Sequence, residues 1–483
     1  MATIKQNFFY NALINVLNVL FPFITAPYVA RVLAPEGVGL FNFALMYAGY
    51  FSMVAALGIP TYGVRETAKV KDDMEAKNRL FSELFSIQVF TTIAVVVLYF
   101  ISVAAIPKLS QNWKLFAVMG TVLYLAPFGT DWYYAGCERF KFVAMRSALI
   151  KALSVVALFI FVKDRGDLLI YALICVSTNI VNNTWNFIKL IREGIRPRLV
   201  LSGFRKHIKP VMLLFASAVA VSVYTLLDTV MLGFLAEYSE VAYYSNSANI
   251  TRAIIAALTS FAGVAIPRIS AYMSEGNEEK VQELAGKSFS MVSFLAIPAA
   301  VGLACIAPDF APLFYGDKFY GTIVPLQIMS LIIVAIGFNN LSGVQVLIGL
   351  GKDRLYLRSV VIGAVTNLTL NFILIPVLGA RGAALSSVAA ESLIFILTMY
   401  YVRRDTFVRL HALGDIAKSF AVAALFVPLV LLMGRFLTGW VLVCSFIAAG
   451  FCLYVFLEWA LGNSAVTLFF SAVSSFLEKH GLK

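Results

Sequence analysis

Long apolar segments, separated by short polar ones, occupy almost the whole chain. A helix that crosses the hydrocarbon layer of a membrane needs about 20 mostly apolar residues, so the pattern predicts about 14 membrane-spanning helices. The apolar segments are continuous, unlike the alternating strands of a membrane β-barrel. The predicted spans cover residues 8–33, 38–63, 80–105, 114–137, 143–162, 168–190, 207–235, 240–266, 287–308, 322–349, 356–377, 380–402, 414–434 and 440–461. A further amphipathic helix is expected at the membrane interface over 464–480.

The composition places the chain outside the soluble classes. Of the 483 residues, 60% are hydrophobic and 13% are charged, whereas about 25% of the residues in a soluble domain are charged. Too few polar side chains remain to cover a soluble enzyme, a disordered protein or a secreted disulfide-linked module. The five cysteines lie in apolar segments without a C-x-x-C pair, and we interpret them as packing residues. The predicted class is an all-α polytopic membrane protein.

The net charge of +12 would suit a nucleic-acid-binding protein, but the positions of the charges indicate another cause. Most of the 38 Lys and Arg residues fall in segments on the same side of the membrane as the N-terminus. Short loops rich in Lys and Arg stay in the cytoplasm. The imbalance therefore predicts that both termini are cytoplasmic, and it assigns only Arg252 to the interior of a span.

The two halves of the chain resemble each other at an offset of about 200 residues. The segment VLAPEGVG, Val32–Gly39, stands between the first two spans, and FLAEYSEV, Phe234–Val241, stands between the seventh and eighth. A repeat of six spans keeps its orientation, as in transporters built from parallel repeats. The alternative is chance likeness between apolar helices. The predicted organisation is a six-helix lobe over 1–200, a second over 201–410, and two added helices with a tail over 411–483.

Three motifs resemble a known group of membrane proteins. PYVARVLAPEGVGLF, Pro27–Phe41, and LGIPTYGVRE, Leu57–Glu66, are similar to segments of the polysaccharide (O-antigen-type) flippases. NLTLNFILIP, Asn367–Pro376, is similar to a motif of the wider multidrug/oligosaccharidyl-lipid/polysaccharide exporter superfamily. One departure is Ala34, which stands where Gly is common. The resemblance implies two pseudo-symmetric six-helix lobes around a central cavity, plus two extra helices.

Polar side chains form a stripe along the first span. Asn7, Asn11, Asn15 and Asn18 are spaced by four, four and three residues and so share one helix face. Amides are unfavourable against lipid, so this face is expected to line a cavity. The alternative is hydrogen bonding to a neighbouring helix.

The eighth span carries a second polar face, formed by Asn246, Asn249 and Arg252. An arginine at this depth is costly unless it is paired or hydrated. Because a guanidinium binds phosphate oxygens well, Arg252 is the first candidate for binding the pyrophosphate of a lipid carrier. Asp228 in the seventh span is the most plausible partner of Arg252. A purely structural pair between these two residues is the alternative.

Two further charges lie within predicted spans. Arg31 stands near the outer end of the first span, where the resemblance implies a role in the cavity lining; ordinary snorkelling to the interface is the alternative. Glu391 lies midway along the twelfth span among small residues. It could take up a proton or a sodium ion and couple transport to an ion gradient, or it could be a hydrogen-bonded packing residue. Asn367 and Asn371 could face it.

The resemblance implies a flippase that moves an undecaprenyl-pyrophosphate-linked oligosaccharide across the bacterial inner membrane by alternating access. The expected partners are this substrate, membrane lipid and other membrane proteins of polysaccharide assembly, but no nucleic acid. No enzymatic activity and no cofactor are expected, because a Walker-type phosphate loop and metal-ligand spacing are missing from the sequence. An ion-coupled multidrug or small-metabolite exporter is the main alternative. A glycan polymerase is disfavoured by the short external loops.

Overall fold

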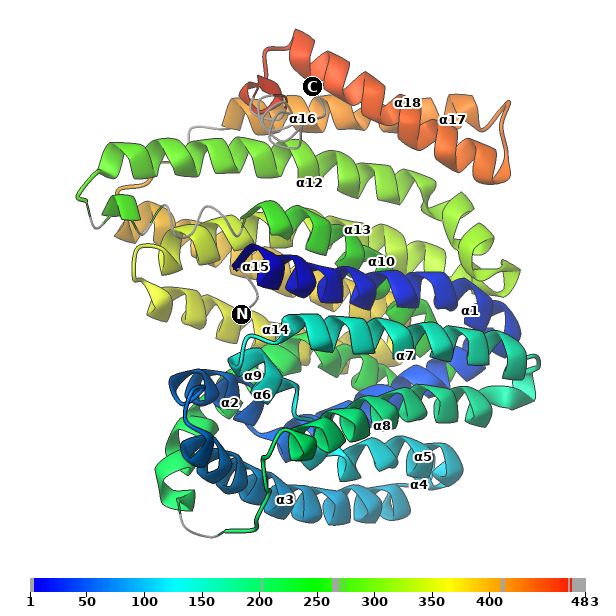
Figure 1. Ribbon diagram of the computed structural model, residues 1–483. Coiled ribbons are helices and arrows are strands. Elements are labelled where there is room, and N and C mark those ends of the chain that lie inside the picture. Colours follow the sequence, from blue (N-terminus) through cyan, green and yellow to red (C-terminus); the bar gives the residue numbers. More distant parts are fainter. Residues whose placement is uncertain are drawn as a thin grey trace. The chain divides into compact units, whose positions relative to one another are not determined.

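The computed structural model describes residues 4–200, 203–262, 269, 271–273, 275–409, 413–467 and 470, and all regular elements in these ranges are helical (Figure 1). The chain forms two compact units, Met1–Val241 and Ala242–Lys483. In the described ranges, ten helical segments are long and apolar enough to cross a membrane. Within the same ranges, every predicted span coincides with one helix or with consecutive helices. The predicted all-α polytopic fold is thus confirmed.

The first unit contains nine α-helices and ends with the first residues of α10. The elements are α1 (Ile4–Ala56), α2 (Ile59–Lys69), α3 (Met74–Ala105), α4 (Pro107–Ser110), α5 (Trp113–Tyr124), η1 (Ala126–Phe128), α6 (Asp131–Gly136), α7 (Phe140–Phe161), η2 (Arg165–Asp167), α8 (Leu168–Arg192) and α9 (Phe204–Leu235). Helix α9 packs against α1, α2 and α3 and so belongs to this unit by its contacts. The lobe boundaries predicted from the sequence repeat stay predictions.

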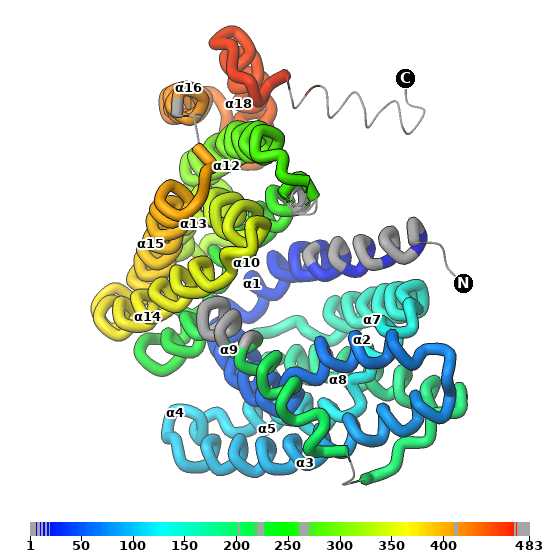
Figure 2. Tube along the Cα trace, turned by 90° about the vertical axis from the view of Figure 1, so that its left-hand side faces the viewer, coloured from blue at the N-terminus to red at the C-terminus, as the bar shows by residue number. Residues whose placement is uncertain are grey.

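The second unit contains most of α10 and all later described elements. These are α10 (Tyr238–Ala262), α12 (Glu278–Tyr315), η3 (Asp317–Thr322), α13 (Ile323–Asn339), the π-helix η4 (Asn340–Ile348), α14 (Asp353–Leu378), α15 (Ala380–Asp405), α16 (Leu413–Ala424), α17 (Phe426–Met433) and α18 (Gly439–Ala460). Helix α15 packs against both α13 and α14 (Figure 2), while α16, α17 and α18 contact α12. Most of the predicted interfacial helix over 464–480 lies outside the described residues.

Helix α1 combines the first two predicted spans and is interrupted at Ala34. This residue has φ 59° and ψ 173°, a backbone region that is almost restricted to glycine. Pro35 follows directly and lacks the N–H that a continuous helix would need. The corner between the two predicted spans therefore occurs at Ala34.

In two other predicted spans, glycine or proline residues interrupt the helix. The second ends at Ala56, and the tight turn at Leu57 and Gly58 starts the separate helix α2. A Cβ atom on Gly58 would lie 2.3 Å from Val211 O, so glycine allows α9 to approach this turn. The fourth span is divided into α5, η1 and α6, where Pro127 removes a backbone donor.

The segment before α9 is extended and is bound along α3. Asn78, Ser82 and Ser86 accept hydrogen bonds from the backbone N–H groups of Arg196 (Asn78 Oδ1, 2.6 Å), Arg198 (Ser82 Oγ, 3.2 Å) and Val200 (Ser86 Oγ, 2.8 Å). Four residues of helix rise about 6 Å, nearly the same as two residues of extended chain. Because these two spacings are nearly equal, successive side chains on one face of α3 contact every second residue of the segment.

The corner between α9 and α10 is held by Lys108 of α4. The Lys108 ammonium donates to Ala236 O at 2.7 Å and to Phe234 O at 3.3 Å, and it lies 5.4 Å from the centroid of the Tyr238 ring. Burial lowers the pKa of Lys108, and the nearby Glu237 acts in the opposite direction. The lysine thus satisfies carbonyl groups that the end of α9 leaves without helical partners.

The structure corrects the assignment of Arg252 as the one basic residue inside a span. Arg146 and Lys151, which that assignment places outside the spans, also lie within α7. At a rise of 1.5 Å per residue, Arg146 lies about 9 Å and Lys151 about 17 Å from the first residue of the helix. Both therefore lie inside a helix that is long and apolar enough to cross a membrane.

Candidate functional site

Arg31 lies on α1, three residues before the interruption at Ala34, and its side chain is exposed. Its Nη1 group donates to Pro27 O at 3.5 Å. The neighbouring Tyr28 hydroxyl donates to Val162 O at 2.6 Å, which fixes this part of α1 against the end of α7. The position suits a cation that faces a solvated region, and the cavity role of Arg31 stays a prediction.

The polar stripe of the first span reaches a cation on α7. Lys151 Nζ donates a hydrogen bond to Asn18 Oδ1 and lies 5.8 Å from the centroid of the Phe21 ring. Asn18 is exposed, whereas the side chains of Asn11 and Asn15 lie outside the described part of the structure. Part of the stripe is thus used in contact between helices, as the alternative interpretation expected, and Asn18 also keeps an exposed surface.

A buried ionic cluster joins three helices near the start of α7 and the end of α8. Arg146 Nη2 donates to Asp131 Oδ1 at 3.0 Å, and Asn186 Nδ2 donates to the same oxygen at 2.7 Å. Arg146 is 3% exposed and Asn186 is fully buried, while the Asp131 side chain is 59% exposed. An arginine in this environment needs its negative partner, because burial of a lone charge is very unfavourable.

The polar face of α10 has one buried and two exposed members. Asn246 is 4% exposed, and its backbone carbonyl oxygen accepts a hydrogen bond from the Tyr315 hydroxyl at 3.2 Å. Asn249 and Arg252 are exposed. Asp228 is buried on α9 and interacts electrostatically with Tyr50 of α1. Since Asp228 and Arg252 belong to different units, their pairing stays a prediction.

Glu391 lies in the packed interior of the second unit. It is 4% exposed, and the Asn339 amide donates both to its carboxylate Oε2 and to its backbone oxygen, the latter at 3.1 Å. Asn371 Nδ2 donates to Asn367 Oδ1 at 3.2 Å on the neighbouring helix α14. A π-helix begins directly after Asn339, and such distortions are frequent at functional sites. This group can bind a proton or a small cation at the carboxylate.

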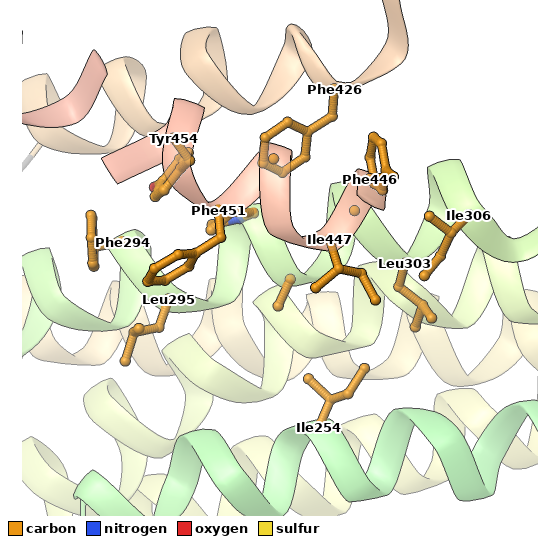
Figure 3. Close-up of a pocket in the computed structure, with 14 residues that line it drawn as sticks. Ile254, Phe294, Leu295, Leu303, Ile306, Phe426, Phe446, Ile447, Phe451 and Tyr454 are labelled. Carbon is orange, nitrogen blue, oxygen red and sulfur yellow. The ribbon is translucent and has the colours of Figure 1, made fainter. Parts of the chain in front are cut away.

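An apolar groove runs along α12 in the second unit. Its volume is about 360 Å³, and it is formed by residues of α10, α12, α17 and α18 (Figure 3). Phe294, Leu303 and Phe426 are among its lining residues, and the exposed Ile447 and Phe451 of α18 line it as well. A groove of this composition fits a hydrocarbon chain and offers little to a charged group.

Sequence reasoning missed two members of these clusters. Asn339 lies within the predicted span 322–349, and its mid-span amide was a signal that could have identified it. Arg146 was assigned to a cytoplasmic segment, although it falls inside the predicted span 143–162. In both cases the partner, Glu391 or Asp131, belongs to a different helix, so only the fold reveals the contact.

Charged and amide side chains within many membrane helices are typical of proteins that move a polar or ionic substrate. The fold and these clusters therefore define a membrane transport protein. A family profile described as "Polysaccharide biosynthesis protein" matches residues 4–273, and a second, MatE, matches residues 214–373. Because the first match covers more than half of the chain, the protein belongs to the polysaccharide biosynthesis protein family.

Individual relatives agree with this family. A putative O-antigen transporter from Escherichia coli K12 is 24% identical over 414 residues, which are 83% of this chain and 97% of the relative. The capsular polysaccharide biosynthesis protein CapF from Staphylococcus aureus is 21% identical over 418 residues, 83% of this chain and 99% of CapF. Among solved structures, the lipid II flippase MurJ in an inward closed conformation has the same fold, with a TM-score of 0.75, 14% identity and coverage of 93% and 98% of the two chains.

Proposed function

We propose that this protein is a flippase for an undecaprenyl-pyrophosphate-linked oligosaccharide, a repeat unit of O-antigen, capsule or a related glycan. It acts in the bacterial inner membrane with both termini in the cytoplasm and carries its substrate from the cytoplasmic to the outer face. The single observation that carries this proposal is the set of cations within membrane helices, Arg31, Arg146, Lys151 and Arg252. Family membership and the names of the full-length relatives support it.

The cations reduce the largest energetic cost of this transport, which is the desolvation of the phosphate groups. Two phosphate groups that crossed a hydrocarbon layer without partners would each face a very large desolvation cost. Exposed guanidinium groups such as Arg31 and Arg252 can form charge-assisted hydrogen bonds to the phosphate oxygens and so replace the water that the phosphates lose. The headgroup then enters a polar cavity from the cytoplasm, and rocking of the two repeats opens it to the outside.

The lipid part of the substrate needs a different environment. The polyprenyl tail stays in the hydrocarbon layer, and the apolar groove along α12 accommodates the part nearest to the headgroup (Figure 3). The exposed Ile447 and Phe451 give this groove an apolar rim. In this arrangement the tail never has to leave an apolar surface during transport.

Glu391 is the proposed coupling residue. A carboxylate that is 4% exposed and hydrogen-bonded to Asn339 is unfavourable in its charged, unliganded form. Uptake of a proton or a sodium ion removes or balances this charge. Because the residue lies between packed helices, occupancy of the carboxylate can favour one conformation of the second unit over another.

The second candidate function is ion-coupled export of a drug or small metabolite. The match of the MatE profile to residues 214–373 favours it, since that segment includes much of the second unit. The two functions differ in the substrate that accumulates when the protein is missing. A drug exporter would change the tolerance to toxic cations and leave surface glycans unchanged.

Deletion in the native bacterium, followed by analysis of the lipid-linked intermediates, tests the proposal. The expected result is loss of one surface glycan and accumulation of its undecaprenyl-pyrophosphate-linked repeat unit on the cytoplasmic face. Re-expression of the wild-type chain should reverse both effects. Normal surface glycan, together with an unchanged pool of lipid-linked intermediates, would contradict the flippase function.

A further inference from the structure

The cluster at Asp131, Arg146 and Asn186 contains more hydrogen-bonding capacity than the protein uses. A guanidinium carries five N–H donors. Arg146 Nη2 donates to Asp131 Oδ1 and, at 3.4 Å, to Ser147 Oγ. The Nε and Nη1 groups of Arg146 have no partner among the described residues. A buried donor without an acceptor is unfavourable, and more so when it is charged. The burial of this arginine is therefore explained only partly by its contact with Asp131.

Acceptor groups without partners lie on the helix that faces Arg146. Asn186 uses its amide N–H₂ group on Asp131, and Asn182 uses its own on Thr178 O at 2.8 Å. The Oδ1 atoms of both amides are buried and have no partner in the described part of the chain. Since the two residues are four apart on α8, they share one helix face. The cluster thus holds free donors from Arg146 and free acceptors from α8.

The surroundings of the cluster are positively charged toward the cytoplasm. The Arg146 guanidinium lies 5.5 Å, and Lys189 Nζ lies 3.6 Å, from the centroid of the Phe142 ring. Lys189 is 36% exposed, and its ammonium lies 3.9 Å from Glu193 Oε1, an oxygen that Arg139 Nη1 binds more closely at 2.6 Å. At 1.5 Å per residue, Asn186 and Arg146 each lie about 9 Å from the cytoplasmic ends of their helices.

We propose that Arg146 and Asn186 form a binding site for a glycosyl phosphate headgroup within the first unit, with Asp131 as the anion that occupies it in the absence of substrate. A desolvated guanidinium recognises a phosphate oxyanion, and the free amide oxygens of Asn182 and Asn186 recognise sugar hydroxyl groups. The half-exposed Asp131 marks the opening, because its carboxylate covers the buried guanidinium. The proposal rests on the proposed function and adds a place where the headgroup first binds.

Displacement of Asp131 by a phosphate group is an exchange of one oxyanion for another. The carboxylate is 59% exposed and can turn toward water, so it retains its hydration when it leaves. The incoming phosphate has more acceptor oxygens than the carboxylate and can also use the Nε and Nη1 donors. In the protein without substrate, the ion pair with Asp131 gives Arg146 a negative partner. A buried arginine without such a partner would be strongly destabilising.

Equilibrium binding of farnesyl pyrophosphate to the full-length protein in nanodiscs tests this site, with farnesol as the uncharged control ligand. Arg146→Ala should weaken farnesyl pyrophosphate binding about tenfold or more. Asp131→Asn should strengthen it severalfold, because the competing negative charge is removed while the shape is kept. Arg165→Ala, which removes an exposed arginine of η2 at the opposite end of α8, should change the affinity less than twofold.

The opposite signs of the two effects separate a binding site from a structural ion pair. Unchanged affinity in Arg146→Ala, weaker or equal affinity in Asp131→Asn, or no binding of farnesyl pyrophosphate by the wild type would each overturn the proposal. If Arg146→Ala does not fold, the Asp131→Asn result decides alone. The flippase function is judged separately by the lipid-linked intermediates of the deletion strain, which can accumulate even if Arg146 has only a structural role.

Discussion

Ala34 shows how a single residue determines the corner between the first two spans. Its φ of 59° and ψ of 173° are strained for any side chain with a Cβ atom, and the residue is buried. Ala34→Gly should therefore stabilise the protein by about 1 kcal/mol, seen as a higher thermal unfolding midpoint in detergent. Ala44→Gly, within the regular second part of α1, should lower the midpoint instead. A lower midpoint in Ala34→Gly would contradict the assigned strain.

Glu391 is the residue whose substitution most directly tests ion coupling. Glu391→Gln keeps the size of the side chain and its contact with Asn339 but removes the capacity to gain or lose a proton. Transport of the lipid-linked glycan should then become less dependent on the proton or sodium gradient, with little change in protein level. The measurement is glycan export in cells with and without an ionophore. An unchanged gradient dependence would remove Glu391 from the coupling mechanism.

At the scale of elements, the extended segment 195–200 forms the connection to α9. Its binding to α3 depends on Ser82 and Ser86, each of which both accepts from and donates to the segment backbone. The double substitution Ser82→Ala and Ser86→Ala should remove about 1 kcal/mol for each lost hydrogen bond. Faster hydrogen exchange or proteolysis within 195–200 is the expected readout.

A control on another helix makes this prediction specific. Ser154→Ala removes a hydroxyl that bonds Lys151 O within α7, and it should leave the segment 195–200 as protected as in the wild type. Equal protection in the double variant and in the wild type would show that side-chain packing, and not these hydrogen bonds, holds the segment to α3.

The elements were largely predictable because hydropathy reports the length of a membrane helix directly. The predicted spans all correspond to helices, but the breaks at Leu57 and Leu425 were not predicted, since the apolar pattern continues through them. The site was less predictable. Arg252 and Glu391 could be singled out by charge alone, whereas the contacts of Asp131 with Arg146 and of Asn339 with Glu391 join residues from different helices.

At the scale of the whole molecule, the distribution of basic residues predicts a topology. Reporter fusions that distinguish cytoplasm from periplasm should place both termini inside, with the loops at 106–113 and 163–167 outside. This follows because most of the Lys and Arg residues lie in segments on the same side as the N-terminus. A periplasmic C-terminus would mean that one span is missing from the assignment, and the predicted six-helix repeats would then be wrong.

The central claim is that the chain itself moves a lipid-linked oligosaccharide across a bilayer. The direct measurement uses proteoliposomes that contain the purified protein and the undecaprenyl-pyrophosphate-linked glycan from the deletion strain, with a membrane-impermeant enzyme that oxidises exposed sugars. The account predicts that wild-type protein renders nearly all of the glycan accessible. Arg252→Ala should slow this at least tenfold, while Arg354→Ala, which removes an exposed arginine at the start of α14, should not. Accessibility that stays at the outer-leaflet fraction with wild-type protein would contradict the claim.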